Sequence, residues 1–268
     1  MNASVTPIAL CADDYAQNPG IDTAIQTLLG LSRLSAVSCF STAPRWLQQA
    51  APALREHRGR ADFGLHFNLT EGFSVRPAEN LQRLILRSLL TRMDPEPLRS
   101  LLHQQLSAFE AGFGQPPDFI DGHQHVHQLR GMRQVLLEVL NSRYPGMPIW
   151  VRNTLPADPQ WRGKPLILKY LGGSAIARDL RAAGIRTNQG FGGVYGFDQA
   201  DYGACMRNWL SSAQAGMLIM CHPGAEPYPD DVIAVQRVVE YLYLQSTEFG
   251  AMLDALKIRL TRLSAIDL

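Results

Sequence analysis

The sequence predicts an α/β protein built on a parallel sheet, and three observations lead to this prediction. The chain has 268 residues, 46% of them hydrophobic, which is enough for one substantial core. Short apolar runs alternate with segments of helical periodicity along the chain. Polar residues come directly after several of the apolar runs, where the carboxyl ends of parallel strands carry active sites. The sheet is therefore expected to be open or closed into a barrel, with its functional residues at one edge.

Six short apolar runs are predicted to form the strands. The first, at residues 8–11, lies between Pro7 and the acidic pair Asp13 and Asp14. The others follow at residues 36–40, 62–67, 119–121, 148–152 and 217–220. Short apolar runs bounded by polar or turn-forming residues are typical of strands buried on both faces.

Between these runs, apolar residues recur with the spacing of amphipathic helices. Helices are predicted at residues 21–28, 46–57, 81–92, 97–113, 132–140, 202–213, 232–244 and 252–263. Residues 71–80 are predicted to be a loop. A less regular stretch follows the strand predicted at 148–152 and runs to about residue 197. The glycines in this stretch indicate a loop that needs close backbone approach: Gly190, Gly192, Gly193 and Gly196. We expect residues 1–268 to form a single domain.

Bulk composition argues against a nucleic-acid or membrane-surface partner, because the net charge is only +1. A small, neutral or weakly charged substrate fits this balance. No apolar window is long enough to span a membrane, and no basic or apolar leader stands at the amino terminus. Cys11, Cys39 and Cys221 lie in or beside predicted strands and are expected to be reduced core thiols. We expect a cytoplasmic protein.

Histidines gather at the ends of the predicted strands. Five of the seven lie at or just after strand ends: His66, His123, His125, His127 and His222. A lone histidine is more often a hydrogen-bonded surface or core residue, but three within five residues favour a metal or catalytic site. Two imidazoles and one carboxylate make an open metal site with room for water and substrate.

The geometry of residues 121–127 leaves two arrangements open. In an extended chain, Asp121, His123, His125 and His127 would share one face, because alternate residues point to the same side. If the strand stops near His123, only one or two of them reach a common point. The sequence alone does not choose between these arrangements.

Asp13 and Asp14 follow the first strand and are ambiguous by themselves. A carboxylate pair at this position is as often a turn or a helix cap as a functional site. Beside a histidine site, one carboxylate can bind a metal while its neighbour takes a proton from water. His222 is presented by the turn-forming Pro223 and Gly224, and its ordinary pKa suits a general acid, although a turn histidine without function is equally expected.

Arg152 ends the fifth predicted strand and could pair with Asp13 or Asp121, holding a carboxylate ionised and oriented. The alternative is an ordinary salt bridge at the rim of the sheet. Tyr15 and Phe191 are more often packing residues than platforms for a sugar ring, and they are kept as candidates for substrate contact.

Four segments together resemble, in the same order, the motifs of the YdjC/ChbG-type carbohydrate deacetylases, a family that includes the hopanoid-associated HpnK branch. They are residues 12–15 (ADDY), 64–72 (GLHFNLTEG), 120–127 (IDGHQHVH) and 221–224 (CHPG). The resemblance implies a distorted, incomplete (β/α) barrel, similar to a TIM barrel and to the NodB-type fold, with one divalent metal ion. It implies magnesium, whereas an Asp–His–His set would suit zinc or another transition metal better.

Residue by residue, the resemblance implies that Asp14, His66 and His123 are the metal ligands and that Asp13 is the general base. By looser analogy with the NodB-type polysaccharide deacetylases, His222 is the general acid and Arg152 orients Asp13. The other expected site residues line the substrate or support the ligands: His125, His127, Asp121, Tyr15 and Phe191. Cys11 and Ala16 depart from the asparagine and glycine usual in the first motif, and this bears on substrate identity more than on chemistry.

The expected function is therefore metal-dependent removal of N-acetyl groups from amino sugars or short chitin-type oligosaccharides. One alternative is hydrolysis of another amide or a phosphoester, including a hopanoid- or glycolipid-linked amino sugar. Only Arg152 and Arg130 lie near the motifs, which argues against a phosphate site. The other alternative is an inactive sugar-binding protein, which would need a broken metal set. The expected partner is a small carbohydrate, and a homodimer is expected from family habit alone.

Overall fold

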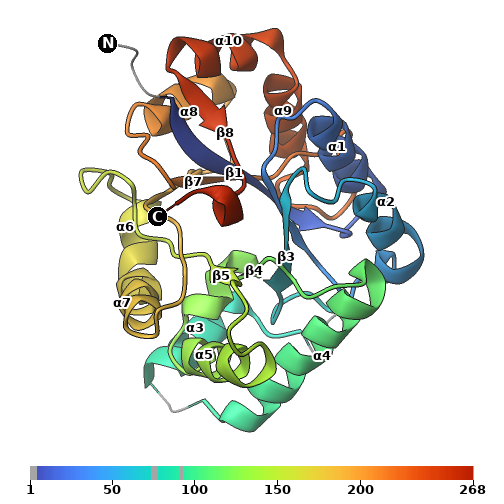
Figure 1. Cartoon of the computed structure of the whole chain (residues 1–268), viewed down its shortest axis with the longest axis vertical. Helices are drawn as coiled ribbons and strands as arrows, with labels where there is room; N and C mark the ends of the chain where they lie inside the picture. The colour runs from blue at the N-terminus through green and yellow to red at the C-terminus, as the bar shows by residue number, and fades with distance from the viewer. Residues whose placement is uncertain (1–4, 74–77, 91–92, 268) are drawn as a thin grey trace.

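A computed structural model describes residues 5–73, 78–90 and 93–267 of the chain. Its strands form one parallel sheet, in the order β5-β4-β3-β2-β1-β7-β6, and β8 pairs with the beginning of β1 (Figure 1). The strands are β1 (Thr6–Tyr15), β2 (Ala36–Cys39), β3 (Asp62–Phe67), β4 (Phe119–Gly122), β5 (Trp150–Val151), β6 (Phe191–Gly192), β7 (Leu218–Cys221) and β8 (Ile258–Leu260).

Helices surround this central sheet (Figure 1). The α-helices are α1 (Pro19–Gly30), α2 (Ala51–Arg55), α3 (Leu81–Leu90), α4 (Pro95–Phe113), α5 (Met132–Arg143), α6 (Lys164–Leu168), α7 (Ser174–Ala182), α8 (Tyr202–Leu210), α9 (Ala234–Leu244) and α10 (Thr247–Ala255). Two π-helical turns, η1 (Trp46–Ala50) and η3 (Lys169–Gly173), and two 3₁₀ turns, η2 (His123–Gln128) and η4 (Leu263–Ala265), complete the order.

The sheet curls into a barrel that stays open between β5 and β6. These are the two edge strands, and the described residues join them only through the bridge between Pro156 and Phe191 and nearby loop contacts, such as the bond from Val151 N–H to the Arg186 carbonyl. This arrangement confirms the predicted distorted, incomplete (β/α) barrel. That one domain spans residues 1–268 stays a prediction.

Alternation along the strands separates two layers of core. On β1, Ile8, Leu10 and Ala12 pack outward in the large core that the helices cover, while Ala9 and Cys11 belong to the inner core of the barrel. The inner core also contains residues of the other strands and of the carboxyl-terminal segment: Ala36, Phe119, Trp150, Phe191, Leu218, Met220, Leu263 and Ile266.

The carboxyl-terminal segment closes the amino end of the barrel. Asp62, the first residue of β3, accepts hydrogen bonds from the Ser264 backbone N–H at 2.9 Å and from Trp150 Nε1 at 3.0 Å. Leu263 and Ile266 complete the apolar interior beside them. Because this end is filled, the open carboxyl end of the strands is left for chemistry.

Several sequence predictions are corrected by the structure. The helix predicted at 252–263 is wrong beyond Ala255, because α10 ends there and residues 258–260 form β8. Lys257, with φ +53°, turns the chain there, and β8 completes the edge of β1 that β7 leaves unpaired. The glycine-rich loop contains the short strand β6, the run at 148–152 is reduced to two strand residues, and the helix at 46–57 begins as η1. Residues 74–77 of the predicted loop and residues 91–92, at the end of the helix predicted at 81–92, lie outside the described residues.

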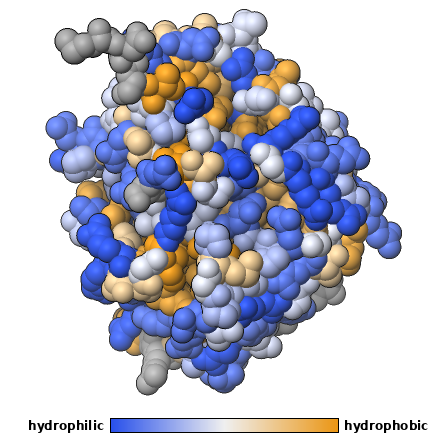
Figure 2. Space-filling view, in the orientation of Figure 1, coloured by the Kyte–Doolittle hydropathy of each residue, from blue (hydrophilic) through white to orange (hydrophobic). Residues whose placement is uncertain are grey.

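None of the described helices combines the length and the apolar character needed to cross a bilayer. On the face drawn in Figure 2, hydrophilic side chains interleave with smaller hydrophobic areas.

Asp118 is expected to make stability depend on pH. Its Oδ2 accepts the Phe63 backbone N–H at 2.8 Å, and burial, helped by the charge of Asp62, raises the pKa of Asp118 from 3.8 to about 6. The folded state therefore binds this proton more tightly than the unfolded chain, so Asp118 lowers stability as pH rises through that window. Asp118→Asn keeps the hydrogen-bond acceptor and should be more stable than the wild type by about 1 kcal/mol at pH 7.

Urea unfolding of both proteins at pH 3.5 and pH 7 checks this. The stability difference should be small at the lower pH and appear at the higher one. An equal difference at both pH values would contradict the role of the buried carboxyl.

Candidate active site

The inward-facing positions at the carboxyl ends of the strands carry the candidate functional groups. Asp13 continues the inward series of Ala9 and Cys11 on β1. On neighbouring strands, His66 of β3 is the register partner of Asp121 of β4. Ala12 pairs with Cys221, so the next residues along the two strands are Asp13 and His222. Strand alternation therefore aims these side chains into one mouth of the barrel.

A local irregularity brings Asp14 to the same mouth. Adjacent residues of a regular strand point to opposite faces, so Asp13 and Asp14 could not both face the interior. The β1–β2 pairing slips between Ala12 and Tyr15, and Asp14 adopts φ +67°. Positive φ is uncommon for a residue with a side chain and is found where a site requires it. Ala16 also has a positive φ, of +78°.

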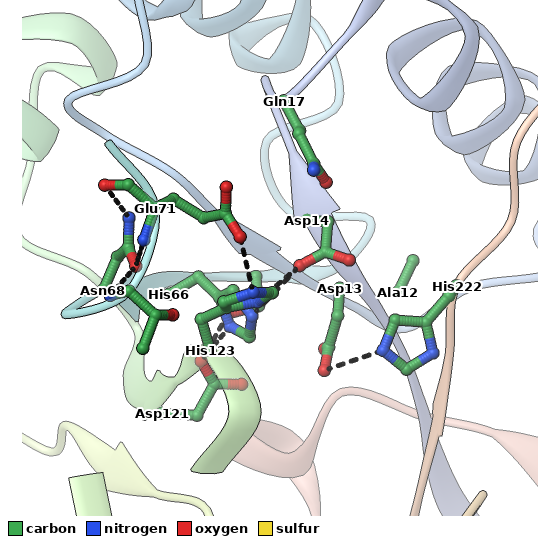
Figure 3. Close-up of polar contacts among 12 residues, drawn as sticks. Ala12, Asp13, Asp14, Gln17, His66, Asn68, Glu71, Asp121, His123 and His222 are labelled. Carbon is green, nitrogen blue, oxygen red and sulfur yellow. Dashed lines mark hydrogen bonds and ion pairs between the residues drawn. The ribbon is translucent and has the colours of Figure 1, made fainter. Parts of the chain in front are cut away.

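Asp14, His66 and His123 meet as one compact group. His66 Nε2 lies 3.3 Å and His123 Nδ1 lies 3.1 Å from Asp14 Oδ1 (Figure 3). One ligand atom from each residue lies within 4.8 Å of the others. His66 and Asp14 are buried and His123 is half-buried. The group is therefore held inside the protein on one side and is accessible from solvent at His123.

Neighbouring groups set the orientation of both imidazoles. Asp121 Oδ1 lies 2.7 Å from His66 Nδ1 and accepts a hydrogen bond from the Ser38 hydroxyl at 2.5 Å. Glu71 Oε1 lies 3.4 Å from His123 Nε2, on the far side of that ring (Figure 3). When a carboxylate accepts a hydrogen bond from one ring nitrogen, the other ring nitrogen keeps a lone pair that can bind a metal ion. This is the usual support of histidine metal ligands. His66 Nε2 and His123 Nδ1 are thereby turned towards Asp14.

The local field favours positive charge inside this group. Burial alone would lower the pKa of His66, but Asp121 and Asp14 outweigh it and raise this pKa to about 10. Burial likewise opposes protonation of His123, yet Asp14 and Glu71 raise its pKa. A divalent cation would meet the same attraction, and its donors would be one carboxylate and two imidazoles. Asp14, His66 and His123 therefore fit a divalent metal ion.

Arg237, on α9, occupies the second oxygen of Asp14. Its Nη2 lies 2.7 Å from Asp14 Oδ2, and its Nε donates to Asp231 Oδ2 at 2.6 Å. Burial would raise the pKa of Asp14, but Arg237 and His123 lower it well below its usual range. Asp14 is thus held as a carboxylate with Oδ1 facing the imidazoles.

Arg152 clamps the neighbouring carboxylate. It is 0% exposed, and its Nη1 and Nη2 donate to Asp13 Oδ2 and Oδ1 at 2.7 and 2.6 Å. Nη2 also lies 2.6 Å from Asp121 Oδ2 and 3.0 Å from the sulfur of Cys11. Burial would raise the pKa of Asp13, but Arg152 outweighs it and holds that pKa well below its usual range. Both pairings considered from the sequence, with Asp13 and with Asp121, are present.

His222 faces Asp13 from the end of β7. Its Nε2 lies 3.9 Å from Asp13 Oδ2, as Figure 3 shows. Burial lowers the pKa of His222 to about 4, so the imidazole is neutral near neutral pH. An ionised carboxylate and a neutral imidazole therefore face each other beside the Asp14 group.

The other predicted site residues take separate places. The strand stops at Gly122 and continues as η2, with Gln124 and His125 at φ +52° and +61°, so the four residues of the extended arrangement do not share a face. His125 packs edge-on against Phe191, with ring centroids 5.6 Å apart.

His127 and Tyr15 lie outside the Asp14 group. His127 is fully buried and donates from Nε2 to the Arg152 carbonyl at 2.9 Å, which helps to fix the main chain of Arg152. Tyr15 is buried, and its hydroxyl donates to the Ala50 carbonyl at 2.9 Å. The structure does not bring Tyr15 to the mouth of the barrel.

Sequence reasoning missed four polar residues of this mouth: Ser38, Glu71, Arg237 and Glu240. Ser38 lies on the inward face of β2, and Glu71 lies inside the motif of residues 64–72, so alternation and motif position could have indicated both. Arg237 and Glu240 are charged residues of an amphipathic segment and carry no local signal, because such residues usually face solvent.

The fold and site define a class of proteins: parallel, incomplete α/β barrels that hold an Asp–His–His group at the carboxyl ends of the strands. The model of the family described as YdjC-like protein matches residues 7–255 of the chain. The chain belongs to this family.

Two relatives and one solved structure illustrate the similarity. A carbohydrate deacetylase from Mus musculus is 32% identical over 150 residues, covering 50% of this chain and 47% of the relative, so the chain spans about half the length of that curated protein. A chitooligosaccharide deacetylase from Proteus mirabilis is 26% identical over 200 residues, covering 70% and 68% of the two chains. A crystal structure from Enterococcus faecalis, of a protein named for cellobiose-phosphate cleavage, has a TM-score of 0.71 at 18% identity, covers 98% and 99%, and shows the shared fold.

Proposed function

We propose that this protein is a metal-dependent carbohydrate deacetylase that hydrolyses the acetamido group of an amino sugar or a short chitin-type oligosaccharide. The observation that carries the proposal is the Asp14–His66–His123 group lying beside Asp13 and His222, which face each other at 3.9 Å. Amide hydrolysis needs a water nucleophile, a stabilised oxyanion and a proton for the leaving amine. The names of the mouse and Proteus relatives support the same substrate class.

Asp14 Oδ1, His66 Nε2 and His123 Nδ1 are proposed to hold the divalent ion. When bound there, such an ion supplies Lewis acidity towards the acetyl oxygen and lowers the pKa of water. Two imidazoles favour zinc or another transition metal, whereas magnesium is the ion implied by family resemblance. Arg237 restricts Asp14 to a single donor oxygen by occupying the other.

Asp13 is proposed to take the proton from the attacking water. Arg152 keeps this carboxylate ionised and fixes both of its oxygens. His222 is neutral before the reaction, so the proton that it gives to the leaving amine must be one that it receives during the reaction. Asp13 Oδ2, 3.9 Å from His222 Nε2, is the adjacent group that has just gained a proton.

Other features of the proposal concern the setting of the enzyme. Free buried thiols at Cys11, Cys39 and Cys221 suit a reducing compartment and support a cytoplasmic location. A homodimer is proposed from family habit, and light scattering of the purified protein tests it.

Acetate release from a panel of N-acetylated mono- and oligosaccharides, with and without chelator, tests the proposed function. We expect release from at least one panel member, a loss of about 1000-fold or more on chelation, and recovery when a divalent metal is restored. A phosphate monoester in the same panel tests the phosphoester alternative. Undiminished turnover in chelator would contradict metal dependence, and phosphate release without acetate release would replace the proposed reaction.

A further inference from the structure

Helix α9 carries a buried carboxyl group that the proposed mechanism does not use. Glu240 is 0% exposed and lies three residues after Arg237 on the same helix. Burial raises the pKa of Glu240 to about 7. Burying an ionisable group is costly unless its oxygens are well bonded, so the contacts of Glu240 indicate what it does there.

One oxygen of Glu240 anchors the turn that presents His222. Oε2 accepts the His222 backbone N–H at 2.6 Å, and two residues later the Gly224 N–H donates to the carbonyl of Arg237 at 3.1 Å. The turn is therefore bonded to α9 on both sides of Pro223. A methyl group added at Gly224 would lie 3.0 Å from the Arg237 side chain, which shows how closely the turn and the helix pack.

The imidazole of His222 depends on this anchoring. Its Nδ1 is buried and has no hydrogen-bond partner among the described residues. A histidine ring is usually oriented by a bond to the nitrogen that does not react. Without that bond, the direction of Nε2 is set by the backbone of the turn and by the packing around the ring.

The other oxygen of Glu240 holds the residues that pack around the His222 ring. Oε1 accepts the Tyr195 hydroxyl at 2.5 Å, and the Tyr195 ring packs on Phe197 with centroids 4.7 Å apart. Phe197 in turn meets the His222 ring edge-on, at 5.1 Å and 87°. Glu240 thus ties the loop after β6 to the turn after β7, and these two segments enclose the His222 imidazole.

We propose that Glu240 is a positioning residue for His222, holding its main chain through Oε2 and its ring through Tyr195 and Phe197. The inference rests on the proposed function, because it assumes that His222 donates the proton to the leaving amine. The hydrogen bonds of Glu240 described above go to Tyr195 and to the His222 backbone and not to the Asp14 group or Asp13, so its removal should disturb proton transfer and leave metal binding intact.

Glu240→Ala is expected to lower kcat for acetate release about 10- to 100-fold, because a small misplacement of a reacting group is costly. KM and the dissociation constant for the divalent metal, measured by titration of the metal-free protein, should each stay within about twofold. Glu240→Gln should restore most of kcat, since its amide oxygen can accept the His222 N–H and its NH₂ can donate to Tyr195. Leu242→Ala, at an exposed position of the same helix, is the control and should match the wild type.

A double substitution separates positioning from a general loss of structure. In a His222→Ala background, adding Glu240→Ala should reduce kcat by less than about twofold, because the group that Glu240 positions is already gone. Full additivity of the two losses, or a Glu240→Ala variant that keeps wild-type kcat, would overturn the inference. Absence of acetate release by the wild type would instead refute the proposed function.

If the Glu240→Ala protein fails to fold, an NMR measurement on the wild type and on Glu240→Gln still tests the proposal. The His222 amide proton, bonded at 2.6 Å to a carboxyl oxygen, should resonate far downfield in ¹⁵N-labelled wild-type protein and move measurably in Glu240→Gln. Tyr195→Phe, which removes only the second arm, should lower kcat without moving metal affinity. An unmoved amide resonance together with full activity of Tyr195→Phe would overturn the proposal.

Discussion

Replacing His66 by alanine is expected to weaken divalent metal binding at least about 100-fold and to lower acetate release at least about 1000-fold. His66 Nε2 faces Asp14 Oδ1 at 3.3 Å, and no other described imidazole except that of His123 joins this group. Losing one of three donors weakens the chelation of the ion, and Lewis-acid stabilisation of the transition state amounts to several kcal/mol. Metal content of the purified variant and its kcat/KM measure the two effects.

His103→Ala provides the matched control. His103 lies on α4 and contacts Arg143 instead of the Asp14 group. This variant should bind metal and release acetate as the wild type does. A His66→Ala protein that is folded and binds metal with wild-type affinity would contradict the proposed ligand set.

Replacing Arg152 by methionine is expected to destabilise the protein by about 3–5 kcal/mol and to reduce acetate release sharply. The substitution supplies an apolar side chain of similar length but leaves Asp13 and Asp121 buried without their cation. Without Arg152, burial would raise the pKa of Asp13, and this carboxylate would be less firmly ionised and oriented. Urea unfolding and kcat measure the two consequences.

Arg178→Met is the comparison for this experiment. Arg178 also pairs with a carboxylate, Asp179, at 2.9 Å, but its side chain is 72% exposed. An exposed pair contributes little, so this variant should lose less than about 1 kcal/mol. Equal stability losses in the two variants would contradict the role assigned to burial at Arg152.

The positions of the site residues could be predicted from the sequence to the extent that strand alternation controls them. His66 and Asp121 are register partners on adjacent strands, and Asp13 extends an inward series that begins at Ala9. Period-two alternation and the rule that sites lie at the carboxyl ends of parallel strands are local, so short apolar runs suffice to apply them. Local patterns predicted the wrong structure at residues 258–260, because pairing with β1 decides there between a helix end and a strand.

The approach of Asp14 to the histidines could not be predicted by alternation, because it requires a strand irregularity with positive φ at a non-glycine residue. The fate of residues 123–127 was open for a similar reason. The left-handed conformations of Gln124 and His125 turn the chain into η2, so only His123 of the three histidines joins Asp14. Both outcomes depend on backbone conformations that sequence patterns describe poorly.

The sequence by itself determined the alternation of strands and helices, the inward series that ends at the candidate acid, base and histidine groups, and the motifs of the YdjC-like family. Only the tertiary structure decided how these groups are held. Arg237 reaches Asp14 across 223 positions of the chain, and Glu240 reaches the turn at His222 from the same helix. The physical reason is that a buried charge is stable only beside partners that folding brings to it, and those partners follow no local spacing.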